Sequence, residues 1–104
     1  MILSTLKNYM FARWNPPPQN NVSKIPQDQK EIIKGNIFNL FYEIKHNDHA
    51  VNLYKEIIYM MILCDYPWDG IDEQLNNDLS SNILASVHFF RQIAKAYEYS
   101  THED

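Results

Sequence analysis

The sequence has little glycine, almost no cysteine and no long hydrophobic run. Its 104 residues include two glycines and one cysteine. An all-β domain of this length needs many tight turns, which favour glycine, so the composition argues against a β-sandwich or a barrel. One cysteine cannot form an internal disulfide, and no run reaches the ~18 apolar residues of a membrane span. The start of the chain also lacks the pattern of a secretory signal, so we expect a cytoplasmic protein.

Basic residues are scarce after the first quarter of the chain. Nine Lys and Arg stand against thirteen Asp and Glu, which gives a net charge of −4. Residues 1–25 carry three bases and no acid, whereas residues 26–104 carry six bases and all thirteen acids. An acidic chain is repelled by phosphate backbones, so we expect no direct nucleic-acid partner. A local acidic cluster would instead attract a cationic surface.

Hydrophobic residues make up 45% of the sequence, and their spacing predicts an all-α fold. We expect one helical domain over residues 1–104, built as a small antiparallel bundle of three long helices plus a short N-terminal helix. The N-terminal segment 1–14 holds the short helix, at 2–13. Four of the five prolines lie in 15–26, which predicts an extended connector. The bundle core then spans 27–99, and the tail at 100–104 should fray.

The three long helices are expected at about 27–46, 48–64 and 72–99. In the first, the apolar stripe keeps its phase across Gly35, so we expect one continuous helix, with a break there as the alternative. Asn47 and Asp48 are good caps for the second helix. That helix is apolar at every position from Ile57 to Cys64, which is typical of a buried central helix, although a short central strand is the alternative.

The last helix follows from a stripe that holds its phase for more than six turns. Weak helix formers around Ser80 make a break there the alternative. The residues of the stripe are Leu75, Leu79, Ile83, Val87, Phe90, Ala94 and Tyr97.

Three groups of side chains could carry chemistry, and each has a simpler structural interpretation. Glu43, His46, Asp48 and His49 lie close together, but a di-iron bundle needs a second such group, and a polar helix end explains them equally. His88 and Arg91 share one side of the last helix without a partner base or nucleophile. Cys64 is the last residue of the most apolar run and precedes Asp65, which favours a buried structural thiol. We therefore predict no catalytic residue, no metal site and no cofactor.

Two further motifs suggest binding. Met60 and Met61 could line an adaptable binding surface, although methionine in a core helix more often fills gaps. Three consecutive prolines, Pro16 to Pro18, could be read by an aromatic groove, although a rigid linker is the default interpretation.

The segment from 65 to 78 is the most informative part of the sequence. It contains five acids, no Lys or Arg, and two large aromatic residues. An aromatic anchor within an acidic rim is typical of a protein–protein interface. The alternative is that the tryptophan caps the bundle while the acids merely decorate a loop and a helix start. The predicted partner-binding residues are Asp65, Tyr66, Trp68, Asp69, Asp72, Glu73 and Asp78.

These features favour a non-enzymatic binding protein. In size, charge and expected helicity the chain resembles small acidic helical immunity proteins that neutralise bacterial toxins. A nuclease toxin has a positive cleft, which an acidic helical protein could block with fast, salt-sensitive association. The expected partner is therefore a protein with a basic surface, and the first functional hypothesis is an immunity protein or antitoxin.

Two other functions are carried as alternatives. The first is a small phage- or plasmid-type regulatory or adaptor protein that binds a partner helix in a groove. The second is a small metal-dependent or nucleic-acid-processing enzyme. The helices are apolar enough that a homodimer could also bury the surplus.

Overall fold

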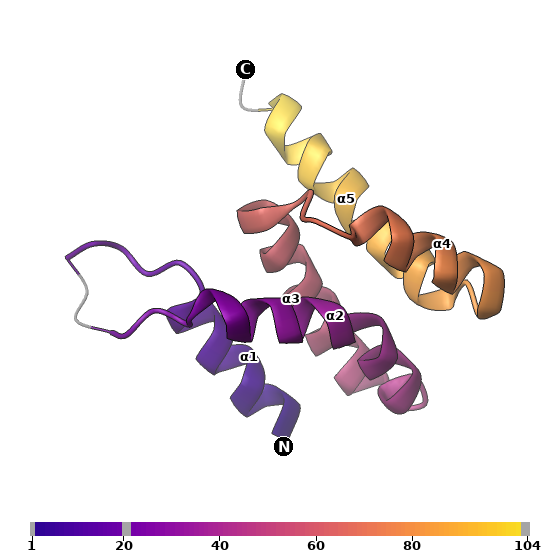
Figure 1. Ribbon diagram of the computed structural model, residues 1–104, viewed down its shortest axis with the longest axis horizontal. Helices are drawn as coiled ribbons and strands as arrows, with labels where there is room; N and C mark the ends of the chain where they lie inside the picture. Colours follow the sequence, from indigo (N-terminus) through magenta and orange to yellow (C-terminus); the bar gives the residue numbers. More distant parts are fainter. Residues whose placement is uncertain (1, 20–21, 103–104) are drawn as a thin grey trace.

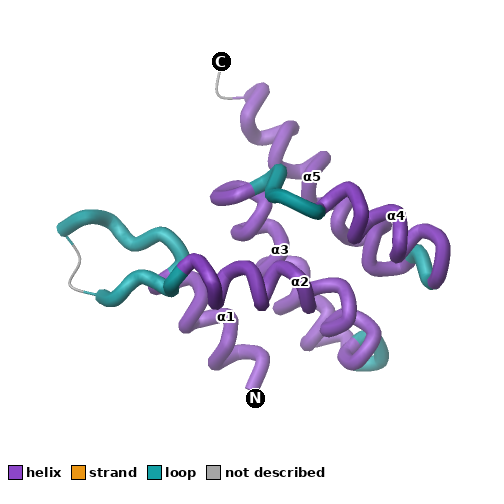
Figure 2. The backbone as a smooth tube through the Cα atoms, in the orientation of Figure 1, coloured by secondary structure: helices purple, strands orange, loops and turns teal. Residues whose placement is uncertain are grey.

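Helices and the turns between them make up the whole of the computed structural model, which describes residues 2–19 and 22–102 (Figure 1). No strand occurs in these residues, so the predicted all-α class is confirmed (Figure 2). The helices are α1 (Ile2–Arg13), α2 (Gln27–Ile44), α3 (Asp48–Asp65), α4 (Ile71–Ser81) and α5 (Leu84–His102).

Helix α3 is the centre of the structure, as the apolar run predicted. Helices α1, α2 and α5 all pack against it. The alternative of a central strand at this position is wrong, because α3 is helical throughout. Its start is fixed by Asn47, whose side-chain oxygen accepts a hydrogen bond from the backbone N–H of Ala50 at 3.0 Å, as expected of a good N-cap. The buried residues of α3 are Ala50, Leu53, Tyr54, Ile57, Ile58, Met61 and Ile62.

Helix α2 continues through Gly35, which confirms the prediction of one continuous helix there. Its N-cap residue is Pro26, which has extended backbone angles. The helix buries the apolar residues Ile37, Phe38 and Phe41. It also buries two lysines, and a buried lysine needs partners for its charge.

The connector between α1 and α2 returns to the point where it leaves the bundle. The backbone N–H of Ile25 donates to the carbonyl oxygen of Arg13 at 2.9 Å, and an Arg13 guanidinium nitrogen donates to the carbonyl of Ser23 at 3.3 Å. Trp14 and Ile25 are both buried at this closure. Residues 1, 20 and 21, which belong to the predicted N-terminal segment and connector, lie outside the described residues.

The predicted continuous last helix at 72–99 is wrong, and the alternative of a break near Ser80 is confirmed: α4 ends at Ser81, and α4 and α5 fold back on each other (Figure 1). The backbone N–H groups of Asn82 and Ile83 both donate to the carbonyl of Asp78, at 2.8 and 2.7 Å, and end α4. Ile83 has a φ of 71°, a left-handed conformation that no helix interior allows. The serines and asparagines before it are weak helix formers, so the chain turns with little loss of helix propensity.

This turn changes which face of α5 meets the core. Helix α5 buries Ala85, Phe89 and the polar residues Ser86 and Gln92. Most of the predicted core stripe is exposed instead. For its members on α5, the reason is that the helical phase restarts after the turn. The exposed members are Leu79, Ile83, Phe90, Ala94 and Tyr97.

The end of the chain is more regular than predicted. Helix α5 continues to His102, three residues beyond the expected limit at Tyr99. The last two residues of the predicted frayed tail, 103 and 104, lie outside the described residues. No helix in the described part is both long enough and apolar enough to cross a membrane.

Candidate functional site

Asp65, the first of the predicted partner-binding residues, forms an internal cluster at the end of α3. Its carboxylate lies 2.8 Å from the ammonium of Lys34 and accepts a hydrogen bond from the indole nitrogen of Trp14 at 3.2 Å. The same ammonium lies 5.4 Å from the centre of the Trp68 ring, close enough for a cation–π contact. This cluster joins α1, α2 and α3, so Asp65 has a structural role.

Tyr66 and Trp68 pack on the bundle. Both side chains are half-buried. Their rings meet the buried ring of Phe89 from α5, at centroid distances of 5.9 Å and 5.7 Å. The indole N–H of Trp68 donates to the Gln74 side chain at 3.1 Å, and that side chain in turn donates to the carbonyl of Lys34 at 2.8 Å. The structure therefore gives the two predicted anchors internal contacts, as in the capping alternative.

Asp78 is buried and caps the start of α5 from α4. One carboxylate oxygen accepts hydrogen bonds from the backbone N–H and the hydroxyl of Ser86, at 2.7 and 2.6 Å. The other accepts from the Tyr42 hydroxyl at 2.6 Å, and that hydroxyl oxygen accepts from the backbone N–H of Ala85 at 3.1 Å. Two N–H groups that a helix start would leave without partners are thus satisfied. Burial, together with the hydrogen bond to Asp78, raises the pKa of Tyr42.

The remaining three predicted residues, Asp69, Asp72 and Glu73, are exposed at and just before the start of α4. None of them forms an ion pair with another described residue. Asp69 lines a hollow of about 260 Å³, to which α2 adds the side chains of Glu31 and Lys34. The side chains of Asp69, Asp72 and Glu73 form the acidic surface, and their role in binding a partner stays a prediction.

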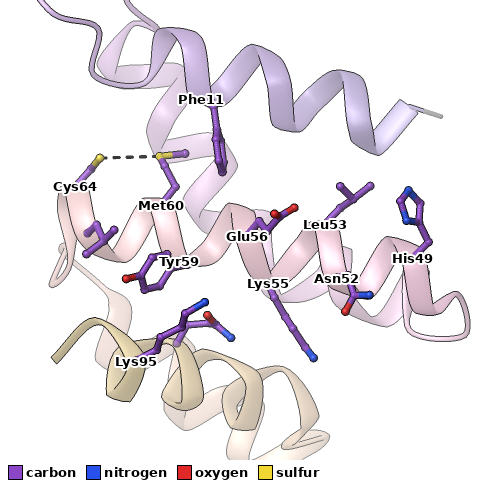
Figure 3. A pocket seen from close by; sticks show the side chains of 12 residues that line it. Phe11, His49, Asn52, Leu53, Lys55, Glu56, Tyr59, Met60, Cys64 and Lys95 are labelled. Atoms are coloured by element: carbon purple, nitrogen blue, oxygen red, sulfur yellow. Dashed lines mark hydrogen bonds between the residues drawn. The ribbon is translucent and has the colours of Figure 1, made fainter. Parts of the chain in front are cut away.

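A groove that the sequence did not single out lies along α3. It has a volume of about 660 Å³, and α1 and α5 form its two sides over α3 (Figure 3). The α3 residues that line it recur every three or four positions, so they follow one face of the helix. Those residues are His49, Asn52, Leu53, Lys55, Glu56, Tyr59, Met60, Leu63 and Cys64.

The open face of α3 corrects the expectation that this helix is buried all round. Leu63 is 58% exposed, and Phe11, which reaches the groove from α1, is 46% exposed. The two methionines divide between the alternatives: Met61 is fully buried, whereas Met60 lines the groove. The sequence did contain a signal for this face. A helix with one open face needs apolar residues only on its packed side, whereas every residue from Ile57 to Cys64 is apolar.

Cys64 is exposed at one end of the groove, so the prediction of a buried thiol is wrong. It lies on the open face of α3, where its sulfur contacts the Met60 sulfur at 3.9 Å (Figure 3). Partial desolvation and the charge of Asp65 raise the pKa of the Cys64 thiol. The thiol is therefore accessible but mostly protonated near neutral pH.

The two histidine-containing groups differ in exposure. Glu43, His46, Asp48 and His49 are all exposed. Among the residues described, no three His, Cys, Asp or Glu side chains come together in a way that could hold a metal ion. His88 packs its ring on Phe41 at a centroid distance of 4.9 Å, while Arg91 is exposed.

His88 should make stability depend on pH. Burial, and then the charges of Lys55 and Arg91, lower its pKa below the ordinary value of 6.5. The unfolded chain therefore takes up this proton at a higher pH than the folded chain does. The stabilisation is complete above pH ~6.5 and is lost as the pH falls through the pKa of the folded state.

Urea denaturation at several values between pH 7 and pH 5 measures this effect. As the pH is lowered from 7 to 5, we expect the free energy of unfolding to decrease less steeply for His88→Asn than for the unmodified protein. His46→Asn is the control, because His46 is exposed. Equal dependence of the free energy of unfolding on pH for the unmodified protein and His88→Asn would contradict the assignment of this effect to His88.

No family model, curated protein or solved structure matches this chain.

Proposed function

We propose that this chain is a non-enzymatic protein-binding module of the cytoplasm that takes a helix of its partner into the groove between α1, α3 and α5. The observation that carries the proposal is the open face of α3. Residues that line the groove occur along the whole of this helix, and two other helices lie on either side of it. An amphipathic helix that lays its apolar face into such a groove is a common mode of recognition.

The apolar part of the groove supports this mode of binding. Phe11, Tyr59, Met60 and Leu63 offer side chains from two helices to one occupant (Figure 3). Aromatic residues and methionine are enriched at protein interfaces, and methionine adapts to different partners. Beside the acidic surface, by contrast, the side chains of Tyr66 and Trp68 already have internal contacts.

Site-specific photo-crosslinking in cells that express the protein tests the proposal. A photoreactive phenylalanine analogue at Tyr59 should crosslink to a helical segment of one partner. The same analogue at Gln19, which is exposed in the connector, serves as the control. Leu63→Arg should weaken this complex by about 2 kcal/mol or more, because it places an unpaired charge in the apolar floor. If the Leu63→Arg variant crosslinks to the partner as well as the unmodified protein does, the proposal is contradicted.

The acidic surface supports a second candidate function, that of an immunity protein or antitoxin that neutralises a cationic toxin such as a nuclease. Asp69, Asp72 and Glu73 are exposed and have no ion-pair partner among the described residues. Carboxylates of this kind speed encounter with a basic surface and pair with its Arg and Lys side chains.

Charge reversal separates this candidate from the first. A photoreactive residue at Asp72 would capture the basic partner. Asp72→Lys with Glu73→Lys should then slow association about tenfold or more at low salt. The matched control is Glu43→Lys with Asp48→Lys, which changes the net charge equally at another place. Equal association rates for the two double variants would count against an electrostatic docking surface.

A further inference from the structure

The groove has the length of a short helix. Its lining on α3 runs from His49 to Cys64, which at 1.5 Å per residue is about 22 Å. A partner helix of about 15 residues would cover that distance. The groove is therefore long and open, a shape that suits a helix.

The charges along the groove are mostly positive. Lys55 of α3 and Lys95 of α5 line it, and Lys95 lies 4.7 Å from the centre of the Tyr59 ring (Figure 3). The one acid that lines the groove, Glu56, already pairs with Lys7 of α1 at 3.0 Å. A contact with an aromatic ring leaves the lysine charge in place, so the basic rim, formed by Lys55 and Lys95, is free to attract an anion.

The field of Lys55 extends into the bundle beside the groove. Burial is the main cause of the lowered pKa of His88, and the charges of Lys55 and of Arg91 of α5 lower it further. Arg91 is exposed one turn before Lys95 on the same helix. This side of an otherwise acidic protein is therefore locally cationic.

We propose that the helix bound in the groove is an acidic amphipathic helix, with an apolar stripe that packs on α3 and with Asp or Glu beside the stripe, facing the basic rim. This inference rests on the proposed function and specifies the partner. Opposite charges at the edge of an interface select the partner and speed its approach, whereas like charges reject it.

The same charges argue against a second copy of this chain as the occupant. In a two-fold dimer built on this groove the same patch is used twice. Such a dimer would bring Lys55 and Lys95 of both copies, four lysines in all, into one interface. The acidic helix should therefore come from another protein.

Two designed peptides test the inference. Both carry the same apolar stripe over about 15 helical residues, flanked by Glu in one and by Lys in the other. We expect the unmodified protein to bind the Glu peptide at least ~10-fold more tightly than the Lys peptide, and salt should reduce this preference. The preference should reverse for Lys55→Glu with Lys95→Glu, but not for the matched control Lys24→Glu with Lys45→Glu.

The one cysteine supplies an independent readout. Because Cys64 lines the groove, a bound peptide should protect its thiol from alkylation. Circular dichroism verifies that each variant remains folded.

The outcomes separate the two levels of the proposal. Equal affinity for both peptides, with both lost in Leu63→Arg, would overturn the acidic partner and leave the groove as a helix-binding site. Binding that Leu63→Arg leaves intact, or no binding of either peptide, would overturn both. A dimer of the protein alone that Leu63→Arg disrupts would replace the acidic partner with a second copy.

Discussion

Replacing Asp78 with alanine should lower the free energy of unfolding by about 3–5 kcal/mol. The carboxylate is buried and accepts three hydrogen bonds, from Tyr42 and from the backbone and hydroxyl of Ser86. Its removal leaves these donors without a partner in the interior, and a buried unsatisfied donor costs about 1–3 kcal/mol. Urea denaturation followed by circular dichroism measures the change.

A neighbour of Asp78 provides the control. Asn77 is exposed on the same helix, so Asn77→Ala should alter the free energy of unfolding by about 0.5 kcal/mol or less. Asp78→Asn keeps one acceptor oxygen and should cost less than Asp78→Ala. A loss below about 1 kcal/mol for Asp78→Ala would mean that the carboxylate does not hold α4, α5 and α2 together.

Trp14→Ala should destabilise the protein by a similar amount, about 3–5 kcal/mol. Trp14 is 1% exposed at the junction of α1 and the connector. Its ring lies 5.1 Å from the ammonium of Lys30, and its N–H donates to Asp65. Alanine would leave a large cavity and would also remove a partner of two buried lysines.

The phenylalanine variant separates packing from polar contacts. Trp14→Phe keeps most of the apolar volume but loses the N–H, so we expect a smaller loss of about 1–3 kcal/mol. Thermal and urea denaturation of both variants make the comparison. If Trp14→Phe costs as much as Trp14→Ala, the hydrogen bond to Asp65 outweighs the packing of the ring.

Local patterns predicted the helices well wherever local chemistry decides them. The apolar run from Ile57 to Cys64, with Asn47 as a cap, was enough to place α3. The stripe of α2 kept its phase across Gly35 because one helical glycine costs only about 1 kcal/mol. Spacing along the chain carries this information directly.

Local weak helix formers made a break between α4 and α5 an alternative, but the contacts that fix it come partly from a residue distant in the sequence. Tyr42 of α2 and Asp78 of α4 both satisfy N–H groups at the start of α5. A stripe from Leu75 to Tyr97 in one phase gave no sign of these contacts. The break then exposed several residues that a continuous helix would have buried.

The acidic segment shows why a site is harder to predict than a helix. Asp65, Asp72 and Asp78 look alike in the sequence, yet one forms an ion pair, one is exposed and one is buried. The difference comes from Lys34, Tyr42 and Ser86, which only the fold brings close. The groove was missed for the same reason, because it needs α1 and α5 on either side of α3.

The hydrogen bond from Ile25 to Arg13 gives the segment between α1 and α2 a practical property. Because the chain leaves and re-enters the bundle at one point, extra residues near Pro17 would move neither helix. Doubling the length of such a loop adds only about 0.6 kcal/mol of closure entropy. The residues that line the groove lie outside this segment. An affinity tag or a fluorophore inserted there would leave the groove free.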